Sequence, residues 1–221
     1  MDFLGDIVTT LVSLSHIELM LGLLLAGAII IVLEDWRLNL WALTAQFVVV
    51  GVLLARVLPL RVALIKVIVG CMVCVILYLT ATRGQLRRDE EASHLFGEPR
   101  LAGREGLSMN LWFRALVVVL AAVVSYGLGN SHPFVEQPLG ISQACYWLVG
   151  IGLLAMVVGR EPFKVGLGLL TFQSGVGILL ATFEQSLSLA ALVGVVSILI
   201  ALAIAYLATA QAAFSLEDDA A

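Results

Sequence analysis

Charged residues are scarce in this sequence. Lys and Arg together number 12 and Asp and Glu 16, so that 13% of the 221 residues are charged, against about 25% in a typical soluble domain. The basic residues form no cluster and are not interleaved with aromatic residues, which excludes an electrostatic surface for nucleic acid. The scarcity of charge also excludes a water-soluble fold.

Cysteine and histidine are scarce as well, with three of each. Cys71 and Cys74 form a C-x-x-C pattern, but the surrounding residues are apolar, which favours small packing residues over a redox or metal pair. Cys145 has no partner pattern. The histidines are scattered along the chain: His16, His94 and His132. Without a Gly-rich phosphate loop, a His-Glu metal spacing or a Ser-His-Asp arrangement, the sequence predicts no catalytic residue, metal or cofactor.

Apolar residues make up 61% of the chain, and the mean hydropathy is +1.07. Several apolar runs reach the roughly 18 to 20 residues that a helix needs to cross about 30 Å of hydrocarbon, and they lack the short alternating pattern of a membrane barrel. These runs predict an all-α membrane protein with seven transmembrane helices, at residues 14–33, 38–56, 60–82, 111–128, 142–159, 163–183 and 188–209.

The basic residues are distributed unevenly over the predicted connections. Arg56 and Arg61 lie on one side, and Lys66 lies within the third span. The other nine bases lie on the opposite side: Arg37, Arg83, Arg87, Arg88, Arg100, Arg104, Arg114, Arg160 and Lys164. The positive-inside rule then predicts the N-terminus outside and the C-terminus in the cytoplasm.

One long hydrophilic stretch, residues 83–110, follows the third span. Its five arginines are offset by five acids, Asp89, Glu90, Glu91, Glu98 and Glu105. A solvated linker is one interpretation, and a docking surface for another subunit is the other. The last residues before the C-terminus, SLEDD at 215–219, are typical of a frayed acidic end.

The sequence contains a candidate internal repeat. Residues 34–46, EDWRLNLWALTAQ, align with residues 161–173, EPFKVGLGLLTFQ, and further along Tyr78-Leu79 aligns with Tyr206-Leu207. Matches at polar positions are harder to obtain by chance than matches between leucines. The alignment predicts parallel three-helix repeats at 1–83 and 142–221, unlike the inverted repeats of many transporters. A charged cytoplasmic loop at 84–110 and a linking helix with an outer loop at 111–141 join them.

Few polar side chains lie within the predicted spans, where a charge costs a few kcal/mol or more. Lys66, about 10 Å along a helix from Pro59, is either a buried relay or an anchor that snorkels to the outer interface. Glu18 lies in the outer third of the first span, where an interfacial carboxylate is favoured over a relay. Gln46 and Gln173 are related by the repeat, and we expect each to hold an interhelical hydrogen bond.

Two stripes of small residues predict close approach between helices. One stripe follows Lys164 along the sixth span at helical spacing: Gly168, Thr171 and Gly175. The other lies on the seventh span: Gly194, Ser197, Ala201 and Ala208. We expect the sixth and seventh spans to pack tightly on each other or on a partner subunit.

The stretch from Gly159 to Leu180, GREPFKVGLGLLTFQSGVGILL, resembles component E of hydrogenase-4. It is more distantly similar to the 4L subunit of respiratory complex I and to the C subunit of multisubunit cation/proton antiporters. The segment from Trp36 to Gln46 is similar to the first half of component E, and the chain length and span layout fit the same family. The resemblance implies a bacterial inner-membrane subunit, at most non-catalytic, beside antiporter-like partner subunits.

The sequence departs from that family where its members carry acids within the membrane. Members carry a membrane-embedded glutamate where this chain has Gln173 or, in the 4L alignment, Leu170, and the span at 188–209 has no acid. We therefore expect an accessory subunit of a proton-translocating assembly that contributes packing. The alternative is a self-contained small transporter or channel with a midplane polar site built from Lys66, Gln46 and Gln173. A structural protein that docks a soluble partner through the charged loop is a third possibility.

Overall fold

The computed structural model describes seven helices. It covers residues 16–33, 35–56, 59–95, 107–132, 139–159, 162–184 and 186–219, and within these ranges there is no strand. The helices are α2 (His16–Val32), α3 (Trp36–Ala55), α4 (Leu60–Leu95), α5 (Leu107–Ser131), α6 (Leu139–Val158), α7 (Pro162–Phe183) and α8 (Leu187–Asp219). Each coincides with one predicted span, so the prediction of an all-α membrane protein with seven helices is confirmed.

Most of the helices are long and apolar enough to cross a bilayer. Six of them contain a suitable stretch of at least 18 residues. The seventh, α2, has 17 residues, which span about 26 Å at 1.5 Å per residue, slightly less than the 30 Å or so of a typical hydrocarbon core. The chain is therefore an integral membrane protein.

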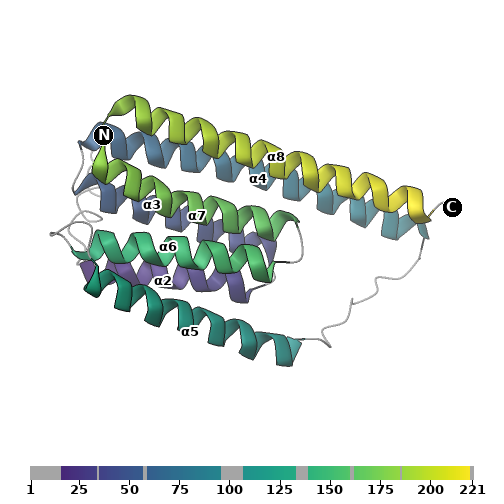
Figure 1. The fold of residues 1–221 in the computed structure, drawn as a ribbon. Coiled ribbons are helices and arrows are strands. Elements are labelled where there is room, and N and C mark those ends of the chain that lie inside the picture. The colour runs from purple at the N-terminus through teal and green to yellow at the C-terminus, as the bar shows by residue number, and fades with distance from the viewer. Residues whose placement is uncertain are drawn as a thin grey trace, which may run out of the picture.

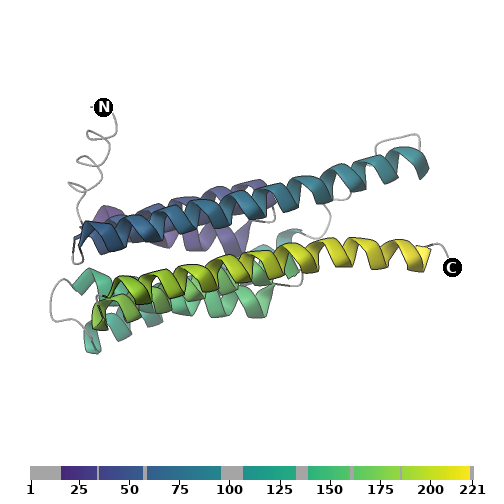
Figure 2. The same ribbon diagram turned by 90° about the horizontal axis from the view of Figure 1, so that it is seen from above.

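The helices form two layers, with α5 at the side (Figures 1 and 2). The first layer contains α2, α3 and α4, and the second contains α6, α7 and α8. Across the layers, α2 contacts α6, α3 contacts α7 and α4 contacts α8, while α5 packs on α6 and α2. Each helix of the first layer thus contacts the helix with which the sequence repeat pairs it. The duplication itself stays a prediction.

Two of the helices, α4 and α8, extend past the others at the same end of the bundle (Figures 1 and 2). The prediction of a loop at 84–110 is wrong at both ends of this range. Helix α4 continues to Leu95, and α5 begins at Leu107. The remainder of the range, 96–106, lies outside the described residues. The acidic end is also helical, through Asp219. Both segments contain Leu and Glu, and the first also contains Ala, Gln and Arg; all of these are strong helix formers.

Glycines bring α6 and α7 into close contact. A Cβ atom added at Gly152 of α6 would collide with the backbone nitrogen of Phe172 in α7. One added at Gly168 would lie 2.8 Å from the backbone nitrogen of Met156, and one at Gly175 2.8 Å from the Val149 side chain. The small-residue stripe of the sixth span therefore lies against α6, the preceding helix. The sixth and seventh spans, α7 and α8, do contact each other as expected, but through other residues, such as Gly166 against Ile204.

The second stripe lies at the contact between α8 and α4. A Cβ at Gly194 would be 3.0 Å from the Val69 side chain of α4, and Ser197 and Ala201 are buried. The Ser197 hydroxyl donates to the carbonyl oxygen of Val193, 3.0 Å away, so its hydrogen bond stays within its own helix. These small side chains let the long helices α4 and α8 lie close together.

A tryptophan that the sequence analysis did not single out ties the two layers together. Trp147 of α6 is buried, and its indole nitrogen donates to the carbonyl oxygen of Leu23 in α2 at 3.0 Å. Gly27 leaves room for this ring, since a Cβ there would lie 3.0 Å from the indole nitrogen. A buried tryptophan needs such an acceptor, and here the acceptor belongs to a helix 124 positions away in the chain.

Candidate functional site

Lys66 is the intramembrane charge that the sequence analysis singled out, and its amine is buried between helices. Its Nζ atom has no hydrogen-bond partner among the described residues. A Cβ added at Gly177 of α7 would lie 3.0 Å from this atom. The centroid of the Phe47 ring of α3 is 5.9 Å away, within the range of a cation–π contact. The absence of a side chain at Gly177 leaves the space that the amine needs.

The amine does not reach the end of the bundle, as that of a snorkelling lysine would. Gly177 lies six residues before the end of α7 at Phe183, a distance of about 9 Å along the helix axis. Lys66 lies six residues after the start of α4, at a similar depth. This geometry places a cationic group inside the protein, about one and a half turns from the interface.

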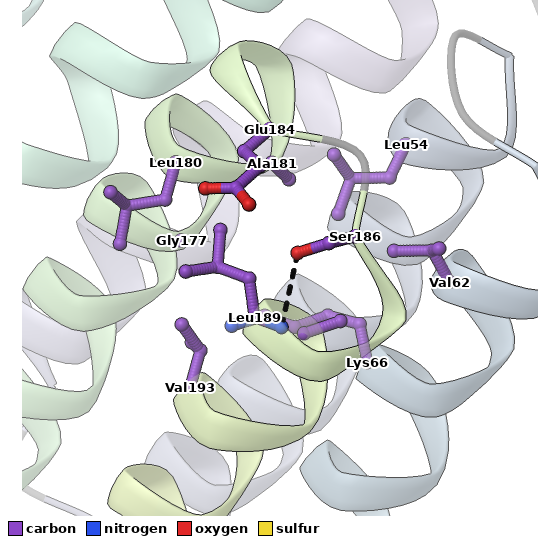
Figure 3. A pocket seen from close by; sticks show the side chains of 11 residues that line it. Leu54, Val62, Lys66, Gly177, Leu180, Ala181, Glu184, Ser186, Leu189 and Val193 are labelled. Atoms are coloured by element: carbon purple, nitrogen blue, oxygen red, sulfur yellow. Dashed lines mark hydrogen bonds between the residues drawn. The ribbon is translucent and has the colours of Figure 1, made fainter.

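A small pocket adjoins the amine where α3, α4, α7 and α8 meet (Figure 3). Its volume of about 30 Å³ is enough for one or two water molecules, since one water needs at least about 10 to 15 Å³. The lining is mostly apolar: Leu54, Val62, Gly177, Leu180, Ala181, Leu189, Ala190 and Val193. Its polar members are Lys66, Glu184 and Ser186.

The polar groups opposite Lys66 come from the connection between α7 and α8. The Ser186 hydroxyl accepts a hydrogen bond from the backbone nitrogen of Leu189 at 3.3 Å, which caps the start of α8. Glu184 follows the last residue of α7 and is exposed. In Figure 3 Lys66 extends from α4 toward α7, while Glu184 and Ser186 enter from the connection.

Sequence reasoning missed both Glu184 and Ser186. A serine directly before an apolar run is a helix-start signal, so the capping role of Ser186 could have been found. The approach of Lys66 to this connection could not, because it depends on how α4 packs against α7 and α8.

The two repeat-related glutamines behave differently. Nε2 of Gln173 donates to the carbonyl oxygen of Val193 in α8 at 3.1 Å, which is the interhelical hydrogen bond that we expected. The amide of Gln46 is fully buried, but neither its oxygen nor its nitrogen has a partner in the described part of the chain. For Gln46 the expected hydrogen bond is therefore absent from the described structure.

The polar residues predicted to form one midplane site are not all brought together. Lys66 lines the pocket, whereas Gln46 and Gln173 do not. Glu18 is exposed on the first turn of α2, as an interfacial carboxylate would be. The pocket is thus nearer to one end of the bundle than a midplane site would be.

The cysteines show no arrangement suited to a metal. Cys71 is exposed and Cys74 is buried, so their side chains occupy different environments on α4. The Cys145 thiol donates to the carbonyl oxygen of Gly175 in α7 at 3.3 Å. Within the ranges that the structure covers, no group of three or more His, Cys, Asp or Glu could hold a metal ion.

The fold and the pocket define the class of protein, a polytopic helical membrane protein with one buried lysine beside a small cavity. Comparison with protein-family profiles, with curated proteins and with solved structures finds no match for this chain. A function must therefore be argued from the chain's own residues and geometry.

Proposed function

We propose that this chain is a membrane-embedded accessory subunit of a complex-I-like or membrane-bound-hydrogenase-like proton-translocating assembly. The observation that carries the proposal is the extension of α4 and α8 beyond the bundle (Figure 1). With 36 and 33 residues, these helices are about 54 and 50 Å long, some 20 Å more than the hydrocarbon core. Helices that leave the membrane together offer neighbouring subunits a rigid docking surface.

The sequence similarity to component E of hydrogenase-4 supports the same proposal. It lies in α3 and α7, the middle helices of the two layers. The positive-inside rule puts the extended ends of α4 and α8 on the cytoplasmic side, where a soluble part of such an assembly could contact them.

The flanks of the bundle leave room for membrane neighbours. Only 17% of the spanning stretch of α5 and 22% of that of α8 are buried inside the chain. These apolar surfaces contact lipid, and antiporter-like subunits are the neighbours that the proposal adds. Because lipid tails are as apolar as leucine, such contacts depend on close packing.

The test is to purify the chain from its native membrane in mild detergent by a C-terminal tag and to identify the chains that accompany it. We expect antiporter-like or redox subunits in fixed proportion. A variant that ends at Ala210, and so lacks the extended part of α8, is expected to insert normally but to recover these partners less well. Recovery of the full chain as a lone monomer would contradict the proposal.

A self-contained transporter or channel is the second candidate. It is favoured by the buried Lys66 amine beside a pocket and by the unpartnered amide of Gln46, since polar groups inside a membrane often mark a substrate or ion path. Reconstitution of the chain alone in liposomes separates the two candidates. Flux of an ion or solute would favour transport, and no flux would favour the accessory subunit.

A further inference from the structure

We propose that the pocket between α4, α7 and α8 is a hydrated proton-exchange site, in which water connects the Lys66 amine to the Glu184 carboxylate. The ligand of the site is the proton, and its route leads from the buried amine to the aqueous face at the connection between α7 and α8. The role of this exchange in a larger assembly rests on the function proposed above, whereas the water access itself does not.

The first argument is the state of the amine. Lys66 Nζ is enclosed and has no hydrogen-bond partner among the described residues, although an ammonium group has three N–H donors. Leaving such a group both charged and unsolvated is very unfavourable. The contact with the Phe47 ring supplies only part of what water would provide, so the geometry favours water beside the amine.

The second argument is the adjoining space. The pocket holds one or two water molecules by volume, and a buried water needs two to four polar partners. Lys66 can donate and the Glu184 carboxylate can accept. The Ser186 hydroxyl can donate, since its oxygen already accepts from Leu189 N and Ser188 Oγ. All three line the same pocket, as Figure 3 shows.

The positions of the charged groups around the amine are consistent with proton transfer from Lys66 to Glu184. The connection between α7 and α8 contributes the Glu184 carboxylate and the Ser186 hydroxyl to the pocket, and the residues of α8 that line it carry no charge. From α3 the nearest charged group at this end is Arg56, at the C-cap of the helix. Glu184 is the acceptor that lies toward solvent, since its side chain is exposed.

The proton step is balanced within these groups. An N–H bond of the Lys66 ammonium breaks as the bridging water takes the proton, and that water passes a proton to a carboxylate oxygen of Glu184. The amine becomes neutral and the carboxylate becomes a carboxylic acid. Glu184 then releases the proton to outside water, and the reverse sequence reloads the amine.

Water access is tested by thiol labelling of the full chain in membrane vesicles. The background carries Cys71→Ala, Cys74→Ala and Cys145→Ser, and single cysteines are placed by Lys66→Cys, Ile68→Cys and Val73→Cys. Ile68 is 59% exposed on the membrane surface of α4 and Val73 is fully buried, so both are dry controls. With a charged methanethiosulfonate reagent, the Lys66→Cys thiol is expected to react about 10-fold faster than either control, because the thiolate forms in water.

A second variant controls for the possibility that Lys66→Cys itself creates the cavity that the reagent enters. Gly177→Leu fills the space that faces residue 66 and is expected to slow labelling of the Lys66→Cys thiol to the rate of the buried control. Labelling of the Lys66→Cys thiol no faster than that of the Val73→Cys thiol, or a rate that Gly177→Leu does not change, would overturn the proposal.

A second measurement keeps the native lysine. The thermal unfolding midpoint of the purified chain is followed from about pH 3 to 11, a range that includes the titration of unperturbed carboxyl and amine groups, for the wild type, Lys66→Met, Glu184→Gln and the double variant. We expect both single substitutions to remove the same pH-dependent component, so that the double variant loses no more than Lys66→Met alone. The control Glu18→Gln, at the same end of the bundle, should keep the wild-type profile. Additive effects of the two substitutions, or a wild-type profile for Glu184→Gln, would contradict the coupling.

Discussion

At the scale of single residues, the polar side chains inside the bundle differ in how well they are satisfied. Several serine and threonine hydroxyls donate to carbonyl oxygens of their own helices; Thr171, for example, donates to Leu167 at 2.9 Å. Gln173 donates across to α8, whereas the amide of Gln46 and the amine of Lys66 have no partner within the described chain. A buried polar group without a hydrogen bond costs about 1 to 3 kcal/mol.

Gln46→Leu is therefore expected to stabilise the protein, by about 1 to 3 kcal/mol, because it removes an unpaired buried amide and keeps its volume. The measurement is the free energy of unfolding in detergent, followed by circular dichroism. Gln173→Leu is the matched comparison, and it should be neutral or destabilising by about 0.6 to 2 kcal/mol because it removes an interhelical hydrogen bond. A loss of stability on Gln46→Leu would show that this amide is bound by a group outside the described residues.

At the scale of helices, the contact between α6 and α7 depends on glycine. Gly152 is the position of closest approach, where an added Cβ meets the backbone of α7 rather than a movable side chain. Backbone atoms cannot move aside as the end of a side chain can, so the helices themselves would have to separate. The packing gained from such close approach is the main source of helix association in a membrane.

Gly152→Ala is expected to destabilise the bundle by about 1 to 3 kcal/mol, the usual cost of overpacking. The control is Gly127→Ala in α5, where an added Cβ would have no neighbour within 4 Å and where alanine has the higher helix propensity. The unfolding free energies of the two variants, measured under one condition, test the prediction. Equal effects at both positions would show that the contact with Phe172 can relax.

The lengths of α4 and α8 show that hydropathy predicts the membrane-spanning part of a helix but not where the helix ends. The end of the apolar run near residue 82 marks where α4 leaves the membrane, not where the helix ends. Charged residues such as Arg and Glu are good helix formers in water, so the helix continues through them. The same applies to the last residues of α8.

At the scale of the whole molecule, the distribution of basic residues predicts the orientation. A reporter fused after Asp219 is expected to be cytoplasmic, so that green fluorescent protein fluoresces there and alkaline phosphatase stays inactive. A fusion at Glu184, after α7, should show the opposite pattern because one helix fewer is crossed. The reverse result at both positions would invert the proposed orientation and would place the extended ends of α4 and α8 outside the cell.

The number, order and approximate bounds of the helices could be predicted from the sequence, because a backbone in lipid must satisfy its own hydrogen bonds and apolar runs then become helices. An interhelical hydrogen bond was expected for both Gln46 and Gln173, and among the described residues it is found for Gln173 but not for Gln46. Which helix each of these residues contacts could not be predicted from the sequence. The glycines of α7 face α6, and Trp147 bonds to α2, because these choices depend on which surfaces fit together.

Sequence alone therefore determined that this is a membrane protein of seven apolar helices with few internal charges. Only the tertiary structure decided that Lys66 ends against Gly177 beside Glu184 and Ser186. Its side chain is long enough to reach either the interface or the interior, and the direction is set by the space that the neighbouring helices α7 and α8 leave open.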